Sequence, residues 1–363
     1  MVQETRINLS KSFFGDAPAT LISSGKLTCT LFTYPSGVQA VKAENEHGYV
    51  IVLPYHGQQV WDLSFGGRSL KMQNLFSQPR DTTVLEDCYG AYMMHCGALR
   101  MGCPAPEDTH PLHGELPLAP YQKASVIVGE NERGRFIGIT GEYQYIRAFA
   151  DTYCARPTVR LYENSTLIDI EMEIENLSHY PMELMYMCHI NIMPAANGRI
   201  IQSHRWNTED MKVRLSIPAF VKPSTEYLAL LDSLKDKPGE LKLLKGGAEY
   251  DPEIVFFNYH VRSDEAGFTH YLQLHEDGTA DYVSYKPSEL KRNVRWILLN
   301  KNQKVIGLAL PATAEPEGYT AEKRKGNVEI LGPKESKTFH VITGYLDRNA
   351  ASEVSAKIDK LMK

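Results

Sequence analysis

The sequence has few cysteines, little tryptophan and no long apolar run. Its six cysteines are too few and too scattered among 363 residues for a disulfide-stapled scaffold; they are Cys29, Cys88, Cys96, Cys103, Cys154 and Cys188. No stretch approaches the roughly 18 apolar residues of a membrane helix, and the opening residues MVQETRINLSKSFF lack the apolar core of a signal peptide. We therefore expect a cytoplasmic protein with reduced thiols and no membrane partner.

An excess of basic residues is also missing. Lysine and arginine total 39 against 44 aspartates and glutamates, which gives a formal net charge of −5. Proteins that bind nucleic acid usually carry a basic footprint for the phosphates, so no nucleic acid partner is expected. With 43% hydrophobic and 23% charged residues, the composition is that of an ordinary globular protein with a large core.

Most of the chain alternates apolar and polar residues with the period of a β-strand. These segments are rich in Val, Ile, Thr, Tyr and Phe and are separated by Gly, Asn, Asp and Pro. They cover residues 26–34, 48–55, 58–65, 125–128, 135–141, 165–175, 182–192, 254–261, 269–274, 294–299, 305–310 and 338–344. Because strands do not alternate with helices, the pattern predicts an all-β fold, a large antiparallel sandwich or barrel.

Helical periodicity is confined to two segments. Residues 224–234 place Leu228, Leu231 and Leu234 on one face, with Ser224 or Thr225 as the capping residue, and residues 350–362 form a second amphipathic segment. No repeat or low-complexity tract divides the chain. We therefore expect a single domain over residues 1–363, with an N-terminal arm at 1–25 and a helical insertion at 224–250.

The densest group of polar side chains lies between Asp87 and Tyr121. This segment is rich in Pro and Gly and holds three cysteines and three histidines, so it predicts a long, functional loop that does not pair along a sheet. The cysteine spacings lack the close pair that zinc sites commonly use. We expect no metal site here, and we interpret these cysteines as small apolar fillers.

Two histidines and a group of carboxylates are candidates for catalysis. His113 precedes Gly114, which lets the backbone turn sharply, and His189 lies near the end of an apolar strand. The glutamates follow the strand at 305–310, where sites at a sheet rim are often built; they are Glu315, Glu317 and Glu322. Each also has a structural explanation, as a core histidine or a solvated turn carboxylate.

Five segments together resemble the aldose 1-epimerase (galactose mutarotase-like) superfamily, and most closely its larger, poorly characterised branch. They are GVQAVKAENEHGYVIVLPYHGQQVWDLSF, HCGALRMG, PLHGELP, MYMCHINIMP and IGLALPATAEPEGY. Their order and approximate spacing match the opening strands, the arginine segment, the Leu-His-Gly, the second histidine and the carboxylate of that family. No single segment is decisive; the ordered set carries the resemblance.

The resemblance implies a β-supersandwich that binds a monosaccharide or a modified sugar and needs no cofactor. It also implies an isomerase that opens the sugar ring by acid–base catalysis and recloses it as the other anomer. By position, His189 would be the general acid and Glu315 the base. His113 and Arg100 would hold sugar hydroxyls, and Asp251 would be a second sugar-binding carboxylate.

One departure from the family pattern leaves the base open. The register of the family's Glu-Pro-x-Thr motif places Leu310 at the glutamate position, whereas a shift of five residues matches Glu315 and Pro316. Either Glu315 acts from a displaced loop, or Glu322 or another carboxylate is the base, or the protein has lost ordinary mutarotation. Two other functions remain as alternatives to the anomer-converting isomerase. One is a sugar-binding protein without turnover, and the other is a different carbonyl-centred isomerase or lyase that uses the same cleft.

Aromatic and basic residues indicate further sugar contacts. Trp206 lies in a polar stretch beside Arg205, where its flat face could stack on a pyranose, whereas Trp61 and Trp296 are expected in the core. Arg80 and Arg205 are candidates to bind a carboxylate or phosphate on the substrate. The sequence does not decide which sugar is bound, whether it is charged, or whether the chain forms a homodimer.

Overall fold

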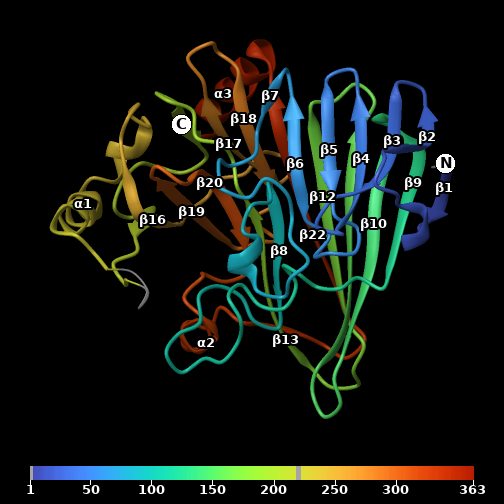
Figure 1. Cartoon of the computed structure of the whole chain (residues 1–363). Helices are drawn as coiled ribbons and strands as arrows, with labels where there is room; N and C mark the ends of the chain where they lie inside the picture. The colour runs from blue at the N-terminus through green and yellow to red at the C-terminus, as the bar shows by residue number, and fades with distance from the viewer. Residues whose placement is uncertain (1–2, 218–221) are drawn as a thin grey trace.

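The computed structural model describes residues 3–217 and 222–363, which build two large antiparallel sheets packed face to face (Figure 1). One sheet has nine strands in the order β1-β9-β10-β11-β12-β22-β18-β17-β14. The other has thirteen: β15-β16-β19-β20-β13-β8-β6-β5-β4-β3-β2, with β21 attached to β13 and β7 to β6. The predicted all-β antiparallel supersandwich is confirmed.

The strands are β1 Gln3–Asn8, β2 Ala19–Ser24, β3 Leu27–Thr33, β4 Gln39–Asn45, β5 Gly48–Val52, β6 Val60–Phe65, β7 Arg68–Ser69, β8 Met93–Ala98, β9 Lys123–Asn131, β10 Gly134–Ile146, β11 Thr152–Tyr162, β12 Leu167–Asn176, β13 Met182–Ile190, β14 Arg199–Gln202, β15 Met211–Val213, β16 Tyr250–Asn258, β17 Thr269–Leu274, β18 Ala280–Tyr285, β19 Arg292–Leu299, β20 Lys304–Ala312, β21 Glu329–Leu331 and β22 Ser336–Leu346. The α-helices are α1 Thr225–Asp236, α2 Tyr319–Lys325 and α3 Arg348–Leu361, and the short 3-10 helices are η1 Lys11–Phe13, η2 Leu85–Cys88 and η3 Pro238–Lys242.

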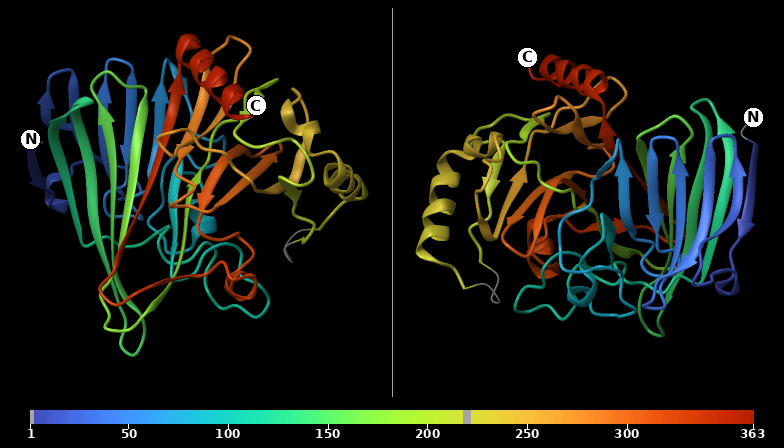
Figure 2. Two further views of the ribbon diagram at one scale, coloured as in Figure 1. Left: turned by 180° about the vertical axis from the view of Figure 1, so that it is seen from behind. Right: turned by 45° about the horizontal axis from the view of Figure 1, so that its top comes forward.

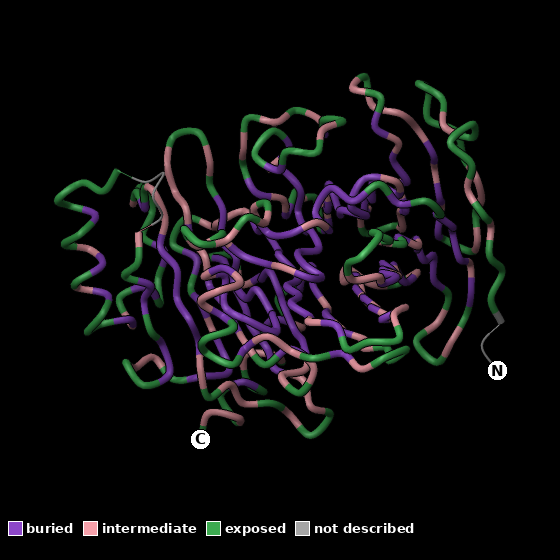
Figure 3. Tube along the Cα trace, turned by 90° about the horizontal axis from the view of Figure 1, so that it is seen from below, coloured by how far each residue is buried: buried purple, intermediate pink, exposed green. Residues whose placement is uncertain are grey.

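The core lies between the two sheets. Along β12, buried and half-buried side chains alternate strictly, with the isoleucines and methionine inward and the carboxylates outward. Across the core, Tyr186 of β13 stacks on Phe339 of β22 with ring centroids 4.7 Å apart. Figure 3 shows the buried backbone concentrated in the middle strands and the exposed backbone in the connections. The centre of the thirteen-stranded sheet is therefore covered by the other sheet on its inner side.

Strand β8 corrects the prediction of an unpaired loop between Asp87 and Tyr121. The run MMHCGA contains no proline, and all six of its residues are buried. It pairs with β13 from Met93 to Ala98 and touches β6 through Val60. The rest of the segment does form a long connection, so the prediction holds on both sides of the strand but not within it.

The segments near both ends of the described chain pack into the sandwich. Of residues 1–25, expected as an N-terminal arm, the first two lie outside the described residues, and the rest contribute β1 to the edge of one sheet and β2 to the edge of the other. Helix α3 packs on β14, β17 and β22, above the sheets in Figure 2. None of the helices in the described ranges is long and apolar enough to cross a membrane.

Helix α1 lies at the far end of the thirteen-stranded sheet (Figure 1) and falls within residues 224–250, the segment expected from the sequence to be a helical insertion. Of the two predicted capping residues, Ser224 and Thr225, the structure uses Ser224, whose side chain accepts a hydrogen bond from the Tyr227 amide. The predicted face is wrong at one position, because Leu228 is 47% exposed while Tyr227, Leu231 and Leu234 are buried. The buried stripe consists of Tyr227, Leu231 and Leu234, which are spaced four and three residues apart. Tyr227 therefore takes the buried position that was predicted for Leu228.

This corrected face gives a matched pair of mutations. Leu231→Ala should lower the free energy of unfolding by about 2–5 kcal/mol, because it leaves a cavity under the helix. Leu228→Ala should change the free energy of unfolding by no more than about 0.5 kcal/mol. Urea unfolding followed by circular dichroism measures both; equal losses in the two variants would contradict the assignment of the face.

Candidate functional site

His113 and His189 lie side by side on the outer face of the thirteen-stranded sheet. Their ring centroids are 5.0 Å apart with the rings nearly perpendicular, although 75 residues separate them in the sequence. His113 is 7% exposed and His189 is 3% exposed. The fold thus brings together the two histidines that the sequence singled out.

Strand β13 directs His189 away from the inner core. Its neighbour Cys188 is opposite His95 of β8, whereas His189 is opposite Met94. Tyr186 faces inward, because its ring stacks on Phe339 of β22 across the core. His95 faces the same way, because its Nδ1 lies 2.8 Å from the Tyr186 hydroxyl. Side chains alternate along a strand, so His189 emerges on the opposite face.

The backbone after β8 places His113 over β13. His113 has a positive φ of 60°, and its amide donates to the Gly102 carbonyl while its carbonyl accepts from the Gly97 amide. Gly114 also has a positive φ of 84°, and a Cβ there would lie 1.9 Å from the Arg100 carbonyl oxygen. Only glycine fits this close approach, so the predicted sharp turn at His-Gly has a specific cause.

Glu115 fastens the same loop to the sheet. Its carboxylate accepts hydrogen bonds from the amides of Ala98 and Leu99 and from the Tyr153 hydroxyl, at 2.8–3.0 Å. Asp108 fastens the loop to α2 by accepting from the Thr320 amide and hydroxyl. Neither acid was predicted from the sequence. Their role is to fix the loop at two points, Glu115 to the sheet and Asp108 to α2.

Burial determines the protonation of the histidine pair. It lowers the pKa of His189 to about 4, partly offset by the Asn191 side chain. It also holds the pKa of His113 well below the usual value, with the neighbouring His189 acting in the same direction. Both imidazoles are therefore neutral at pH 7.

Two further aromatic residues complete the group around the histidines. The Tyr89 hydroxyl lies 3.2 Å from the Nε2 of His189, and the Tyr89 ring also faces His113. The Trp296 ring lies 5.5 Å from that of His189 and 5.9 Å from that of Tyr89. Trp296 was expected in the core; it is instead half-buried on the outer face, because a register shift between Val294 and Trp296 interrupts the alternation of β19.

Glu315 is buried beyond the end of β20, with both carboxylate oxygens engaged. Oε1 accepts from the Tyr259 hydroxyl and Oε2 from the Lys325 ammonium, each at 2.7 Å. Glu322 is fully buried in α2, where it accepts from Lys325, from the Asn327 amide group and from the Glu315 backbone amide. Glu322 is thus not the solvated turn carboxylate considered as an explanation from the sequence, and burial raises its pKa.

The strand position beside His189 is apolar. Bridges Met187–Ala312 and Ile192–Ile306 join β13 and its extension to β20, and Leu310 lies between them. Leu310 is 2% exposed. The strand register therefore supplies no carboxylate at the position where the family pattern would place its glutamate.

A carboxylate that the sequence analysis missed lies closer to the aromatic group. Glu253 of β16 accepts a hydrogen bond from the Trp296 indole at 2.6 Å and forms an ion pair with the buried Arg214. Glu317, from the β20–α2 connection, lies 3.9 Å from the same guanidinium and accepts from the Ser216 hydroxyl. Asp251, which was named instead of Glu253, is exposed and accepts from Asn300.

The other candidate residues, all within the described ranges, form no hydrogen bond, ion pair or ring contact with His113 or His189. Arg100 lies over the Tyr319 ring at 3.6 Å and pairs with Glu183. Arg80 and Arg205 are exposed, Arg80 over Phe76. Trp206 is half-buried and lies over the buried Arg295. Only His113 and His189 of the eight predicted residues share direct ring contact.

The cysteine-rich segment is distributed over different elements. Cys88 and Cys96 are buried, while Cys103 is half-buried. Across the residues that the structure describes, no three His, Cys, Asp or Glu side chains come together as a metal-binding group. The Cys88 sulfur accepts a hydrogen bond from the Arg80 amide, which is a structural contact.

Comparison with known proteins places this fold. Residues 35–195, less than half of the chain, match the model of a domain of unknown function, DUF4432. No curated protein matches the sequence. A Klebsiella pneumoniae protein named as a candidate aldose 1-epimerase is similar over 100% of this chain and 96% of its own, with a TM-score of 0.80 at 16% identity.

Two further solved structures agree. A galactose mutarotase-like protein from Clostridium acetobutylicum has a TM-score of 0.59 at 14% identity, covering 89% of this chain and 99% of its own. A candidate aldose 1-epimerase from Escherichia coli has a TM-score of 0.51 at 11% identity, with coverages of 88% and 99%. The chain therefore has the galactose mutarotase-like fold, as the resemblance predicted.

The buried histidines make stability depend on pH. Unfolded histidines titrate near pH 6.5, whereas His95 and His189 stay neutral in the folded protein down to pKa values of about 3 and about 4. Below about pH 6.5 the unfolded chain therefore binds more protons, and the free energy of unfolding should fall as the pH is lowered to 4.

The contribution of His189 can be isolated by urea unfolding between pH 7 and pH 4. His189→Asn should flatten the fall in stability relative to the wild type, because it removes one suppressed titration. His47→Asn is the matched control, since His47 is exposed, and should follow the wild-type curve. A His189→Asn curve parallel to the wild type would contradict the suppressed pKa.

Proposed function

We propose that this protein is a carbohydrate isomerase that interconverts the anomers of a monosaccharide or modified sugar at the His113–His189 pair. The observation that carries the proposal is the contact between these two buried histidines, one in the loop after β8 and one in β13, on the outer face of a galactose mutarotase-like fold. Trp296 and Tyr89 add the aromatic surfaces on which the C–H face of a pyranose can stack.

The chemistry requires a base for the anomeric hydroxyl and an acid for the ring oxygen. We assign the acid step to His189, with His113 hydrogen-bonding the sugar. Because His189 is neutral at pH 7, it must gain its proton within the substrate complex. A carboxylate facing it across the sugar would raise its pKa, so the position of the base also controls the acid.

Two carboxylates compete for the role of base. Glu315 has the sequence position, but its oxygens already accept from Tyr259 and Lys325. Glu253 bonds the indole that contacts His189, but it is paired with Arg214. We retain Glu315 as the proposed base and treat Glu253 as its direct rival.

The apolar Leu310 beside His189 favours a second candidate function. A chain without a carboxylate on the strand next to its histidine could bind a sugar without turning it over. Titration calorimetry would then detect sugar binding while anomer exchange stayed at the uncatalysed rate.

Anomer exchange measured by NMR or polarimetry tests the proposal. The substrates are aldoses and ketoses, including phosphorylated and acidic sugars. We expect the wild type to accelerate exchange of at least one sugar, and His189→Asn and Glu315→Gln each to lower kcat by about 10²–10⁴-fold while the fold is retained.

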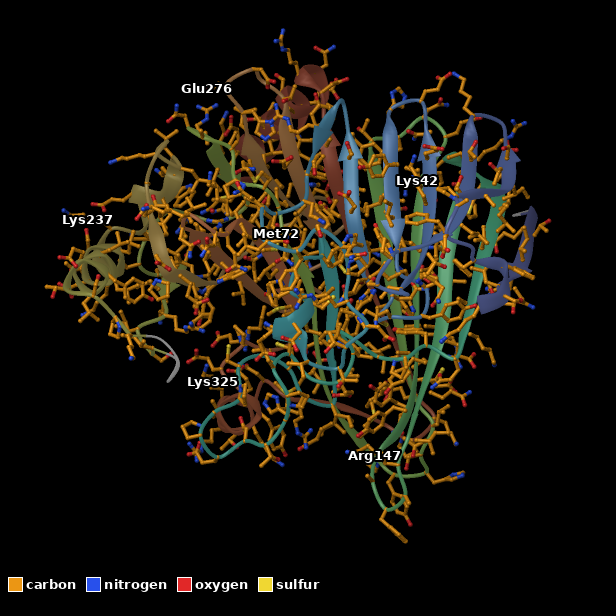
Figure 4. The ribbon with its side chains drawn as sticks, in the orientation of Figure 1. Lys42, Met72, Arg147, Lys237, Glu276 and Lys325 are labelled. Carbon is orange, nitrogen blue, oxygen red and sulfur yellow. The ribbon has the colours of Figure 1, made fainter. Side chains whose placement is uncertain are left out.

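Matched glutamine variants separate the two carboxylates. Loss of activity in Glu253→Gln with an active Glu315→Gln would move the base to Glu253. Glu276→Gln is the control, because Glu276 is exposed at the top of the molecule (Figure 4) and should keep wild-type kcat. A wild type that accelerates no sugar would overturn the isomerase proposal.

A further inference from the structure

The phenol of Tyr89 occupies the space beside the histidine pair. Its ring centroid lies 6.0 Å from that of His189, 6.5 Å from that of His113 and 5.9 Å from that of Trp296. Its hydroxyl oxygen lies 3.2 Å from the Nε2 of His189. Tyr89 thus contacts every other ring of the group at once.

Tyr89 is more exposed than the two histidines that it contacts. It is half-buried, whereas His113 and His189 are buried. Burial raises the pKa of the phenol well above its ordinary value, so the hydroxyl keeps its proton and can donate to the neutral imidazole. The Tyr89 side chain places a six-membered ring beside His189 and a hydroxyl within hydrogen-bond distance of its Nε2. A pyranose edge could present a ring and a hydroxyl in the same way.

The residues on both sides of Tyr89 are anchored, since Cys88 and Leu85 are buried in the core and Gly90 is tightly packed, while the chain further back is exposed. Residues 81–87 are mostly exposed, and η2 has no side-chain cap at its start. Gly90 packs closely against Trp61, Asn74 and Phe76, where a Cβ would come within 3.0–3.2 Å. Because both chain neighbours of Tyr89 are held, movement of the phenol is a rotation of the Tyr89 side chain.

We propose that Tyr89 closes the histidine pair in the free protein and that a ligand reaches His189 by displacing the phenol. The identity of that ligand as a sugar rests on the proposed function, but the closure does not. The residue acts as a gate, and the hydrogen bond to Nε2 is the contact that the ligand must replace.

Reaction of the imidazoles with diethyl pyrocarbonate at pH 7, read for each histidine by mass spectrometry, measures the closure without any sugar. The reagent attacks neutral imidazole, and His189 is neutral at this pH, so slow reaction reports covering rather than protonation. His47 is exposed and serves as the fast reference, while His95 is fully buried and reports unfolding if it reacts.

In the wild type we expect His189 to react at least about tenfold more slowly than His47, because a covered group reacts only when its cover opens. Tyr89→Ala should raise the His189 rate by about tenfold or more with His95 still unreactive. Tyr180→Ala, at a tyrosine that is 78% exposed, should leave that rate unchanged.

Two results would overturn the gate. One is a His189 that reacts as fast as His47 in the wild type. The other is a Tyr89→Ala protein, folded by the His95 criterion, in which His189 stays slow. If Tyr89→Ala unfolds, Tyr89→Leu decides, since it removes the ring and the hydroxyl but keeps an apolar side chain; the His189 rate should still rise, and an unchanged rate would reject the gate. Absence of sugar turnover would reject the proposed function and leave these outcomes intact.

Discussion

The burial of two neutral imidazoles on the outer face of the thirteen-stranded sheet is the constraint on which the rest of the site depends. A charged imidazole is costly to remove from water, so burial lowers both pKa values and the pair stays neutral. Keeping the pair buried requires a cover on a face that the other sheet does not reach. The loop after β8, Tyr89 and Trp296 supply that cover.

The loop itself depends on close backbone packing and on two acids. Gly114 lets the chain pass against the Arg100 carbonyl, and Glu115 satisfies the amides at the end of β8. Asp108 then joins the loop to α2, and the Cys103 amide bonds the Pro316 carbonyl. Segments some 200 residues apart are tied together in this way, so the connection that carries Glu315 is fixed relative to His113.

Much of the fold could be predicted because it follows from local periodicity. The alternation along β12 and the Ser224 cap of α1 need no knowledge of distant residues. The buried strand β8 was missed because its neighbours are rich in proline and glycine, although its own six residues are not. A composition averaged over the whole segment hid a short run that pairs well.

The two histidines could be found from the sequence because each lies in a segment that matches the family pattern in order and spacing. The carboxylates could not be found in this way. A register shift between Tyr250 and Ile254 breaks the alternation of β16, so the facing of Asp251 and Glu253 cannot be read from spacing. A similar shift in β19 brings Trp296 to the outer face. Long-range packing, rather than local pattern, decides which acid lies near His189.

Nitrogen-15 NMR of the imidazole rings between pH 8 and pH 5.5 tests the central claim most directly, because it reports the charge of each buried histidine. The account predicts that His189 and His113 keep the shifts of neutral imidazole over this range. Titration of either ring near pH 6.5 in the folded protein would contradict the buried, neutral pair.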